Sequence, residues 1–259
     1  TAMNIQSLYR YPVKGLSPEA LASVDLHAAQ GFPLDRAYAV TDGSLDFDPA
    51  HPVPAPKTQF LMLAKYEKLA RLKTRFDASS AQLELAEDGK VSQFDLSSDK
   101  DREALAGYLG AYLAVPLPGT PRVVNAPNFQ FTDVSVRSEA LMRSISLINL
   151  DTVADFGRHL NHSLDPLRFR ANVYFSGQPA WTEMEWVDRE LTIGEVVLKV
   201  VRRTKRCAAT SVDPQTGIRD LNIPVSLLQY VKHGDLGIYA EVVRGGTIRP
   251  GDTLVLKDA

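Results

Sequence analysis

Residues 202–220 read Arg-Arg-Thr-Lys-Arg-Cys-Ala-Ala-Thr-Ser-Val-Asp-Pro-Gln-Thr-Gly-Ile-Arg-Asp and contain the only cysteine of the 259-residue chain, Cys207. Four of the five residues before Cys207 are basic, and nearby cations favour the thiolate over the thiol. A thiolate is a nucleophile and a soft metal ligand. The small side chains of Ala208 and Ala209 leave room for a large group beside the sulfur. A buried cysteine that packs as a small apolar residue is the strong alternative on these local facts.

The composition narrows the possible chemistry. One cysteine excludes an internal disulfide, a four-thiolate zinc site and an iron–sulfur cluster held by this chain alone. The balance of 29 Lys and Arg against 31 Asp and Glu argues against a dedicated nucleic-acid-binding protein. No run approaches the roughly 18 apolar residues of a membrane span, and residues 1–10 lack a secretory layout. We therefore expect a cytoplasmic protein without nucleic-acid or membrane partners.

The first half of the chain is dominated by short strands separated by turns. Strands are predicted at residues 4–11, 21–27, 36–41, 69–76, 82–86 and 91–96. Four prolines make residues 46–57 a loop, either an ordinary surface loop or one that closes over a site. Asp99 is expected to cap a helix that extends to Ala114, where Pro116 and Pro118 prevent its continuation.

The second half alternates short strands with a few helices. Helices are predicted within residues 136–145, after Asn149 or Asp151, and at 224–232; strands are predicted at 146–150, 172–176, 190–193, 195–201, 236–243 and 247–256. The absence of repeating βαβ units indicates a mostly β (α+β) chain of barrel architecture. The Pro- and Gly-rich residues 116–127 divide it into two predicted parts, 1–120 and 121–259.

Three separated motifs carry a family resemblance. The pattern Arg206-Cys207-x-x-Thr210-x-Val212-Asp213-Pro214-x-Thr216-Gly217 resembles the signature of MOSC domains, the C-terminal domains of molybdenum-cofactor sulfurases. The segments Tyr11-Pro12-Val13-Lys14-Gly15 and Gly31-Phe32-Pro33-Leu34-Asp35-Arg36 resemble the β-barrel domain that precedes MOSC in the mitochondrial amidoxime-reducing component and its bacterial relatives. Arg168-Phe169-Arg170-x-Asn172 is the third match. The resemblance implies an N-terminal MOSC-associated β-barrel domain at 1–120 and a MOSC domain at 121–259.

The resemblance also implies a molybdenum centre on a molybdopterin, with Cys207 as the metal ligand. Cofactor-binding residues carried over from the matching motifs are Lys14, Gly15, Arg36, Arg168, Arg170, Asn172, Arg206 and Thr210. Arg and Lys bind phosphate by charge-assisted hydrogen bonds, and Asn supplies directional donors and acceptors for a pterin edge. Asp213, the motif acid, either acts catalytically, holding water or protonating an oxygen at the metal, or only builds the turn. Because the motifs come from both parts, the cofactor is expected between them.

The implied activity is a two-electron reduction of N-hydroxylated or N-oxide substrates. Since this chain has no cluster, the electrons would come from a separate donor protein. One alternative is a non-catalytic carrier of molybdenum cofactor or sulfur, with a persulfide on Cys207. Another is a scaffold that has lost the cofactor, in which Cys207 would be buried and inert. Pyridoxal phosphate binding is a further family-level expectation.

The chain also departs from the family pattern. Gly15 stands where relatives commonly have Ser, and the Pro-rich residues 46–57 do not match the relatives. Outside the motifs, His159 and His162 have metal-ligand spacing but no evident third ligand. Trp181 and Trp186 either line a pocket or pack in the core.

Overall fold

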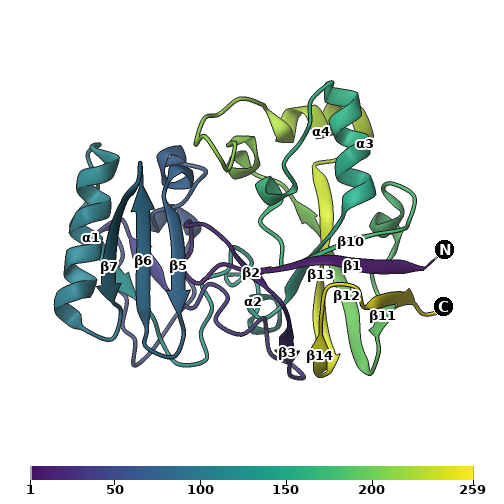
Figure 1. Ribbon diagram of the computed structural model, residues 1–259, viewed down its shortest axis with the longest axis horizontal. Coiled ribbons are helices and arrows are strands. Elements are labelled where there is room, and N and C mark those ends of the chain that lie inside the picture. Colours follow the sequence, from purple (N-terminus) through teal and green to yellow (C-terminus); the bar gives the residue numbers. More distant parts are fainter. Residues whose placement is uncertain (1, 259) are drawn as a thin grey trace.

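The computed structural model describes residues 2–258 and confirms a mostly β fold with a closed barrel. Seven strands follow one another around the barrel, and the last pairs with the first. The barrel lies on the right of Figure 1. Their order is β10 (Val173–Ser176), β9 (Ile145–Asn149), β13 (Asp235–Arg244), β12 (Val196–Lys205), β11 (Glu190–Ile193), β15 (Thr253–Leu256) and β1 (Met3–Arg10). Only the β9–β10 pair is parallel among these barrel pairings. A further strand, β2 (Glu19–Leu21), extends the sheet beyond β1.

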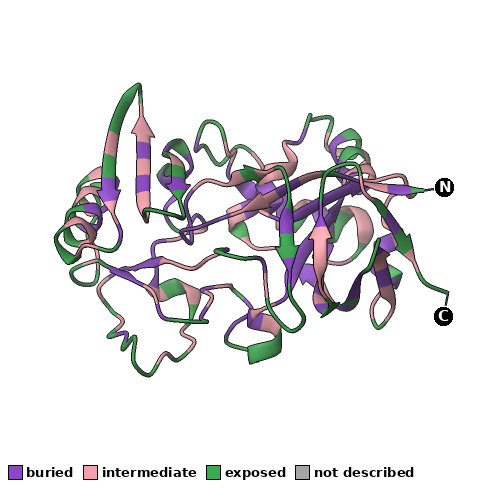
Figure 2. Ribbon diagram, turned by 60° about the horizontal axis from the view of Figure 1, so that its bottom comes forward, coloured by how far each residue is buried: buried purple, intermediate pink, exposed green. Residues whose placement is uncertain are grey.

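Alternating side chains explain the barrel core. In β12, Val196, Leu198 and Val200 are fully buried in the core cluster, whereas Lys199 between them is exposed. Successive residues of a strand point to opposite faces, so this period of two turns the three apolar side chains into the barrel, while the outer face carries both the buried Val197 and the exposed Lys199. Figure 2 shows the same contrast between buried and exposed positions along the strands.

The first half of the chain forms a separate layered unit, seen on the left of Figure 1. Strands β5 (Lys73–Asp77), β6 (Gln82–Glu87) and β7 (Lys90–Asp95) form an antiparallel sheet, and α1 (Asp99–Leu113) packs beside it. The predicted hairpin is therefore present, although residues 69–71 belong to the 3-10 helix η2 (Glu67–Arg71) rather than to a strand. The helix cap is Ser98, not Asp99, because the Ser98 hydroxyl accepts the Asp101 N–H.

Strand pairings connect the two halves across the predicted division at residue 120. β4 (Ala39–Thr41) pairs with β8 (Arg122–Val124), and β3 (Val24–Leu26) pairs with β14 (Gly246–Ile248). β1, the first strand of the chain, is also a strand of the C-terminal barrel. The predicted domain boundary at residue 120 stays a prediction, because each of the two folded units contains strands from both sides of that boundary. As a result, the loop that follows β1 lies at the junction of the two units.

The remaining helices are short. They are α2 (Glu139–Met142), α3 (Leu150–Leu160), α4 (Ile223–Val231) and the 3-10 turns η1 (Lys57–Gln59), η3 (Pro166–Phe169), η4 (Thr182–Glu185) and η5 (Ala208–Ser211). α3 and α4 share a core that includes Phe156 and Leu227, and they cover one end of the barrel (Figure 1). Asn149 caps α3, as one of the two predicted caps. Within residues 2–258, no helix is both long and apolar enough to cross a membrane.

Candidate functional site

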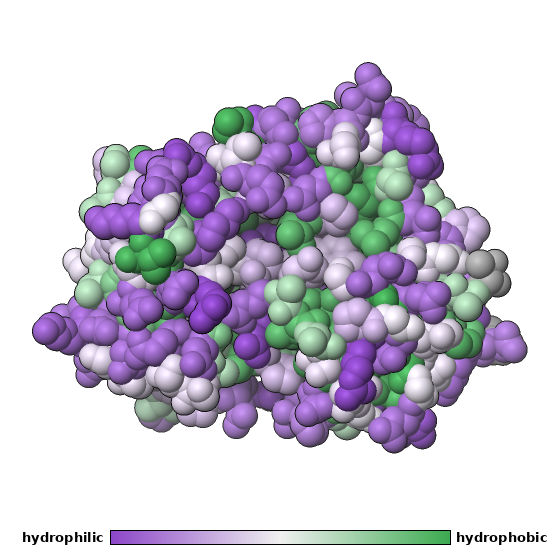
Figure 3. Space-filling view, in the orientation of Figure 1, coloured by the Kyte–Doolittle hydropathy of each residue, from purple (hydrophilic) through white to green (hydrophobic). Residues whose placement is uncertain are grey.

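A cavity of about 440 Å³ lies at the junction of the two units, and cationic side chains dominate its walls. These cations are Lys14, Arg36, Lys57, Arg137, Arg168, Arg170, Arg202, Arg203, Lys205 and Arg206. Asp35 and Asp133 are the only acids in the lining, on a chain whose net charge is −2. Hydrophilic side chains also cover much of the face shown in Figure 3. A cavity with such an excess of one charge concentrates ligands of the opposite sign, so this site is built for anions.

Lys14 is held rigidly at the end of the segment that follows β1. Its backbone N–H donates to the Tyr38 carbonyl, and its ammonium donates to the Phe131 carbonyl at 2.9 Å and to Asp133. Burial lowers the pKa of Lys14, and Asp133 opposes that shift. Gly15 follows with φ +82°, and a Cβ there would lie 2.7 Å from the Leu61 carbonyl oxygen. Glycine therefore satisfies a backbone requirement at this position.

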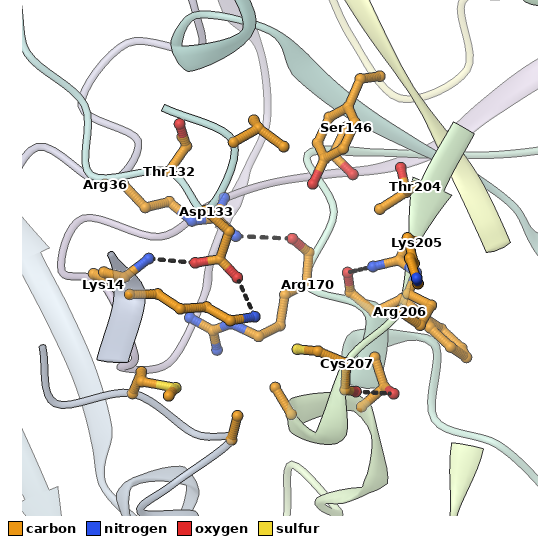
Figure 4. A pocket seen from close by; sticks show the side chains of 18 of the residues that line it. Lys14, Arg36, Thr132, Asp133, Ser146, Arg170, Thr204, Lys205, Arg206 and Cys207 are labelled. Atoms are coloured by element: carbon orange, nitrogen blue, oxygen red, sulfur yellow. Dashed lines mark hydrogen bonds and ion pairs between the residues drawn. The ribbon is translucent and has the colours of Figure 1, made fainter. Parts of the chain in front are cut away.

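Asp133 is a charged residue of the cavity wall that the sequence reasoning missed. Its carboxylate pairs with Lys14 through one oxygen, and its other oxygen lies 3.2 Å from the ammonium of Lys57. Figure 4 shows this carboxylate beside the ammonium of Lys14. Burial alone would raise the pKa of Asp133, but the charges of Lys14 and Lys57 outweigh it and hold that pKa well below its usual range. Asp133 belongs to none of the recognised motifs. The only related signal in the sequence was the Pro-rich segment 46–57, which ends at Lys57 and for which one expected role was to close over a site.

Arg36 and Arg170 place two guanidinium groups against one aromatic ring. Their central carbons lie 4.1 Å and 4.5 Å from the ring centre of Tyr11, which is fully buried. Arg36 donates to both oxygens of Asp35 at 2.9 Å and to the carbonyl of Arg170. Burial and then the charge of Arg36 lower the pKa of Arg170 to about 10, so both groups are cationic at neutral pH. Two like charges this close favour an anion beside them.

Cys207 stands where β12 ends and η5 begins. It is half-buried, and its sulfur faces the cavity in Figure 4. The hydroxyl and the N–H of Thr210 both donate to the Cys207 carbonyl, at 2.8 Å and 3.1 Å, which fixes the backbone at this residue. This placement disagrees with a buried, inert cysteine and leaves the thiol able to bind a ligand in the cavity.

Arg206 lies beside Cys207 and is anchored by backbone oxygens. Its Nε donates to the Leu236 carbonyl at 2.6 Å and its Nη1 to the Phe169 carbonyl at 3.0 Å. A Cβ at Gly237 would lie 2.8 Å from Nη2, so glycine at 237 leaves space for the guanidinium. Burial lowers the pKa of Arg206. The remaining nitrogen, Nη2, is buried without a hydrogen-bond partner among the described residues.

Unpartnered buried polar atoms test whether a molybdenum–pterin cofactor fits. Besides Arg206 Nη2, the Nε of Arg168 and the hydroxyl of Thr204 lack partners within residues 2–258, and all three residues line the cavity. Such atoms are rare in folded proteins because each carries a desolvation cost, so a polar ligand here would satisfy them. No group of three His, Cys, Asp or Glu residues in the described chain has metal-site geometry. The cavity offers one soft sulfur ligand and many cations that can bind phosphate. This donor set fits a metal whose other ligands come from an organic cofactor such as a pterin.

Two predicted cofactor-binding residues line the cavity but use their side chains elsewhere. Arg168 is buried, and its Nη2 lies 2.6 Å from the Asp220 carboxylate. The Asn172 side chain accepts the Ser146 N–H at 3.1 Å and donates to the Tyr9 carbonyl at 3.1 Å, so it joins β1 to β9. Both therefore shape the wall of the cavity through protein contacts, and their predicted cofactor contacts stay predictions.

Asp213 lies outside the cavity lining. One carboxylate oxygen accepts the N–H groups of Gln215 at 2.7 Å and Thr216 at 2.9 Å, and the other lies 3.4 Å from Arg168. Burial would raise the pKa of Asp213, but the two backbone donors and then Arg168 outweigh it and lower that pKa. Of the two expected roles, this geometry favours building the turn, and a catalytic role of Asp213 stays a prediction.

The other candidates from the sequence also lie away from the cavity. The ring of His159 packs on Tyr230, and His162 lies 3.8 Å from Asp220 without further ligands in the described residues. Trp186 stacks on Phe175 in the barrel core. Trp181 packs between the barrel core and the α3–α4 core. Packing is therefore the role of both tryptophans.

Comparison with known protein families finds two adjacent matches. A family model described as the MOSC N-terminal beta barrel domain matches residues 2–114, and one described as the MOSC domain matches residues 130–255. Together they cover most of the chain.

Curated proteins with similar sequences match over part of their length. Mitochondrial amidoxime-reducing component 1 of Mus musculus is 33% identical over 117 residues, which are 40% of this chain and 34% of that protein. Mitochondrial amidoxime reducing component 2 of Homo sapiens is 31% identical over 137 residues, 48% of this chain and 38% of that protein. Molybdenum cofactor sulfurase of Homo sapiens is 32% identical over 89 residues, 30% of this chain and 10% of that protein. The matched region thus spans little more than a third of the amidoxime-reducing relatives.

Solved structures give remote similarities. The YUAD protein from Bacillus subtilis has a TM-score of 0.43 and 13% identity, covering 98% of this chain and 94% of that one. YiiM from Geobacillus stearothermophilus has a TM-score of 0.35 and 20% identity, covering 44% of this chain and 54% of that one.

Proposed function

We propose that this chain, which belongs to the MOSC proteins that carry a MOSC N-terminal beta barrel domain, holds a molybdenum–pterin cofactor in its cationic cavity and reduces N-hydroxylated or N-oxide substrates. The observation that carries the proposal is the position of Cys207. The only thiol of the chain is half-exposed in a cavity lined by ten cations and by buried polar atoms that lack partners. The names of the amidoxime-reducing components support the proposed reduction, and the name of the molybdenum cofactor sulfurase supports the proposed cofactor.

The residues divide into two roles toward this cofactor. Cys207 would bind the metal, and the cations Lys14, Arg36 and Arg170 would bind the phosphate of the pterin, which is a dianion. Arg206 would donate through its unpartnered Nη2. When bound, molybdenum on a pterin dithiolate supplies two-electron oxygen-atom chemistry at a single metal.

The proposed reaction consumes an external reductant. The N–O bond of the substrate breaks, two electrons and two protons are taken up, and the oxygen leaves as water. The electrons come from a separate redox protein, since one cysteine cannot hold an iron–sulfur cluster. Arg36 and Arg170, cationic at neutral pH, would stabilise negative charge in the cavity throughout this reaction. A cytoplasmic location and pyridoxal phosphate binding stay predictions.

The test begins with protein produced in a molybdenum-replete host. We expect stoichiometric molybdenum and pterin, and turnover of benzamidoxime to benzamidine with a reduced viologen as artificial donor. In Cys207→Ala, we expect turnover to fall by at least about 100-fold, since a metal-centred step loses its protein ligand, while the fold is kept. Full turnover by the variant would reject the role of Cys207. A labile sulfur on Cys207 without turnover would replace the proposal with the carrier function.

A further inference from the structure

Three cations of the cavity have no partner in the protein. Arg137 and Lys205 are exposed, and Arg202 is half-buried, yet none of them has an ion pair or a side-chain hydrogen bond within the described residues. Arg203, on the same strand, differs because it lies 2.9 Å from the Glu185 carboxylate and donates to the Met184 carbonyl. The three free cations, Arg137, Arg202 and Lys205, are called the outer cations below.

The other cations of the cavity already have protein partners. Lys14 contacts Asp133, Arg36 contacts Asp35, and Arg170 donates to the Leu16 carbonyl at 2.8 Å. A pterin phosphate would add about two negative charges, and the lining has only two acids against ten cations. Positive charge therefore remains after the cofactor is bound, and the outer cations carry the part that no protein group neutralises.

Strand β12 places Arg202 in the wall of the cavity. In the β12–β13 ladder, Arg202 is the partner of Tyr239, and both residues line the cavity. Side chains of directly paired residues lie on the same face of a sheet, so Arg202 and Tyr239 face the cavity together. Cys207 lines the same cavity. Arg202 is thus a cation without a partner among the described residues, in the cavity that Cys207 also lines.

We propose that the substrates of this protein are anionic: small N-hydroxylated or N-oxide molecules whose carboxylate or phosphate group is bound by Arg202 with Arg137 and Lys205. This inference rests on the proposed function and specifies its substrate class. The oxidised nitrogen of such a molecule would point inward toward Cys207, while its anionic group stays at the outer cations. Charge-assisted hydrogen bonds from arginine to a carboxylate or phosphate orient a ligand as well as attract it.

A pair of nearly isosteric substrates tests this preference. The molybdenum-loaded protein is assayed with 4-carboxybenzamidoxime and with its neutral carboxamide counterpart, and kcat/KM is compared. We expect the carboxylate to be preferred by roughly 10-fold, and Arg202→Gln to reduce that preference by roughly 3- to 10-fold, mainly through KM. Lys199→Gln is the matched control, because Lys199 is an exposed cation of the same strand outside the cavity lining. Added salt should weaken the preference, since the outer cations are accessible to solvent.

Direct binding gives a readout that does not depend on turnover. Calorimetry with the loaded protein should give a lower Kd for the carboxylate than for the carboxamide, and Arg202→Gln should remove most of the difference. Equal kcat/KM and equal Kd for the two molecules would overturn the inference and leave the proposed function intact. A higher KM for the donor protein in Arg202→Gln, with an unchanged substrate ratio, would assign these cations to donor docking and also overturn it. Turnover of neither molecule by loaded protein would reject the proposed function itself.

Discussion

The ammonium of Lys57 lies 3.2 Å from one carboxylate oxygen of Asp133, which ties the end of the Pro-rich segment to the C-terminal half of the chain. The other oxygen of Asp133 pairs with Lys14, which follows the first strand of the barrel. A single carboxylate therefore joins three segments that are distant in sequence, at the wall of the cavity. Of the two predicted roles for residues 46–57, closing over a site agrees better with this contact than an ordinary surface loop.

Asp133→Asn should destabilise the cofactor-free protein by about 1–2 kcal/mol at neutral pH, because it leaves the buried Lys14 ammonium without its counter-charge. The pKa of Asp133 is lowered in the folded state, so its charge contributes stability above the ordinary aspartate range. That contribution is lost as the pH falls through the lowered pKa. The difference in the free energy of unfolding between wild type and variant should therefore be constant from about pH 5 to 8 and shrink below about pH 4.

Urea denaturation at several pH values measures this difference. Asp88→Asn is a suitable control, because Asp88 is an exposed partner of Arg71 at 3.6 Å, far from the cavity lining. Its effect should stay near zero at every pH. A destabilisation by Asp133→Asn that persists unchanged at low pH would show that the carboxylate acts by shape rather than by charge.

Arg168→Met should reduce stability more than it reduces cofactor content. Arg168 is 2% exposed and lies 2.6 Å from the Asp220 carboxylate, so the variant loses a buried charge-assisted contact. Because Asp220 is partly exposed, we expect a cost of about 2–3 kcal/mol rather than that of a fully buried pair. Thermal or urea denaturation gives the stability, and elemental analysis gives the molybdenum. Loss of molybdenum at unchanged stability would instead establish the cofactor contact predicted from the motif.

Asp213→Ala should lower the free energy of unfolding by about 1 kcal/mol, because two backbone N–H groups of the turn lose their acceptor. In the loaded protein, the pH profile of kcat should keep its shape, since the carboxylate lies outside the cavity lining. Disappearance of one limb of that profile, at unchanged molybdenum content, would return Asp213 to the catalytic role expected from its motif.

Local signals in the sequence predicted much of the fold. The hairpin of β5 and β6, the Asn149 cap and the helix α4 follow from side-chain periodicity and capping chemistry, which act over a few residues. The position of β1 in the C-terminal barrel could not be predicted in this way. Its pairing with β10 and β15 connects residues at opposite ends of the chain, and an alternating pattern does not specify a partner strand.

The prediction of the candidate site from the sequence is limited in the same way. The motifs brought Lys14, Arg36 and Cys207 together correctly, because all three line one cavity. Residue type alone did not reveal that Arg168 and Asn172 are occupied by protein partners, since an arginine or asparagine binds a carboxylate or a carbonyl as readily as a cofactor. Asp133 was missed for a related reason: its role comes from two lysines that are distant in sequence.

A comparison of Gly15→Ala with Gly89→Ala separates two causes of destabilisation at residue 15, the left-handed backbone and the steric clash of a Cβ. Gly15 has φ +82°, and a Cβ would lie 2.7 Å from the Leu61 carbonyl oxygen. Gly89 has φ +80°, but a Cβ there would meet nothing within 4 Å. In both variants the left-handed backbone should lower the free energy of unfolding by about 1 kcal/mol, whereas only Gly15→Ala also has to displace a backbone atom.

We therefore expect Gly15→Ala to destabilise the protein by about 2–4 kcal/mol and Gly89→Ala by about 1 kcal/mol in urea denaturation. Because Lys14 is the neighbouring residue and is buried, the displacement should also move its ammonium and lower the molybdenum content of Gly15→Ala but not of Gly89→Ala. Equal destabilisation by the two variants would mean that the chain relaxes around the Cβ at residue 15. In that case a serine would also be tolerated at this position, and the glycine would be a neutral departure from the family pattern.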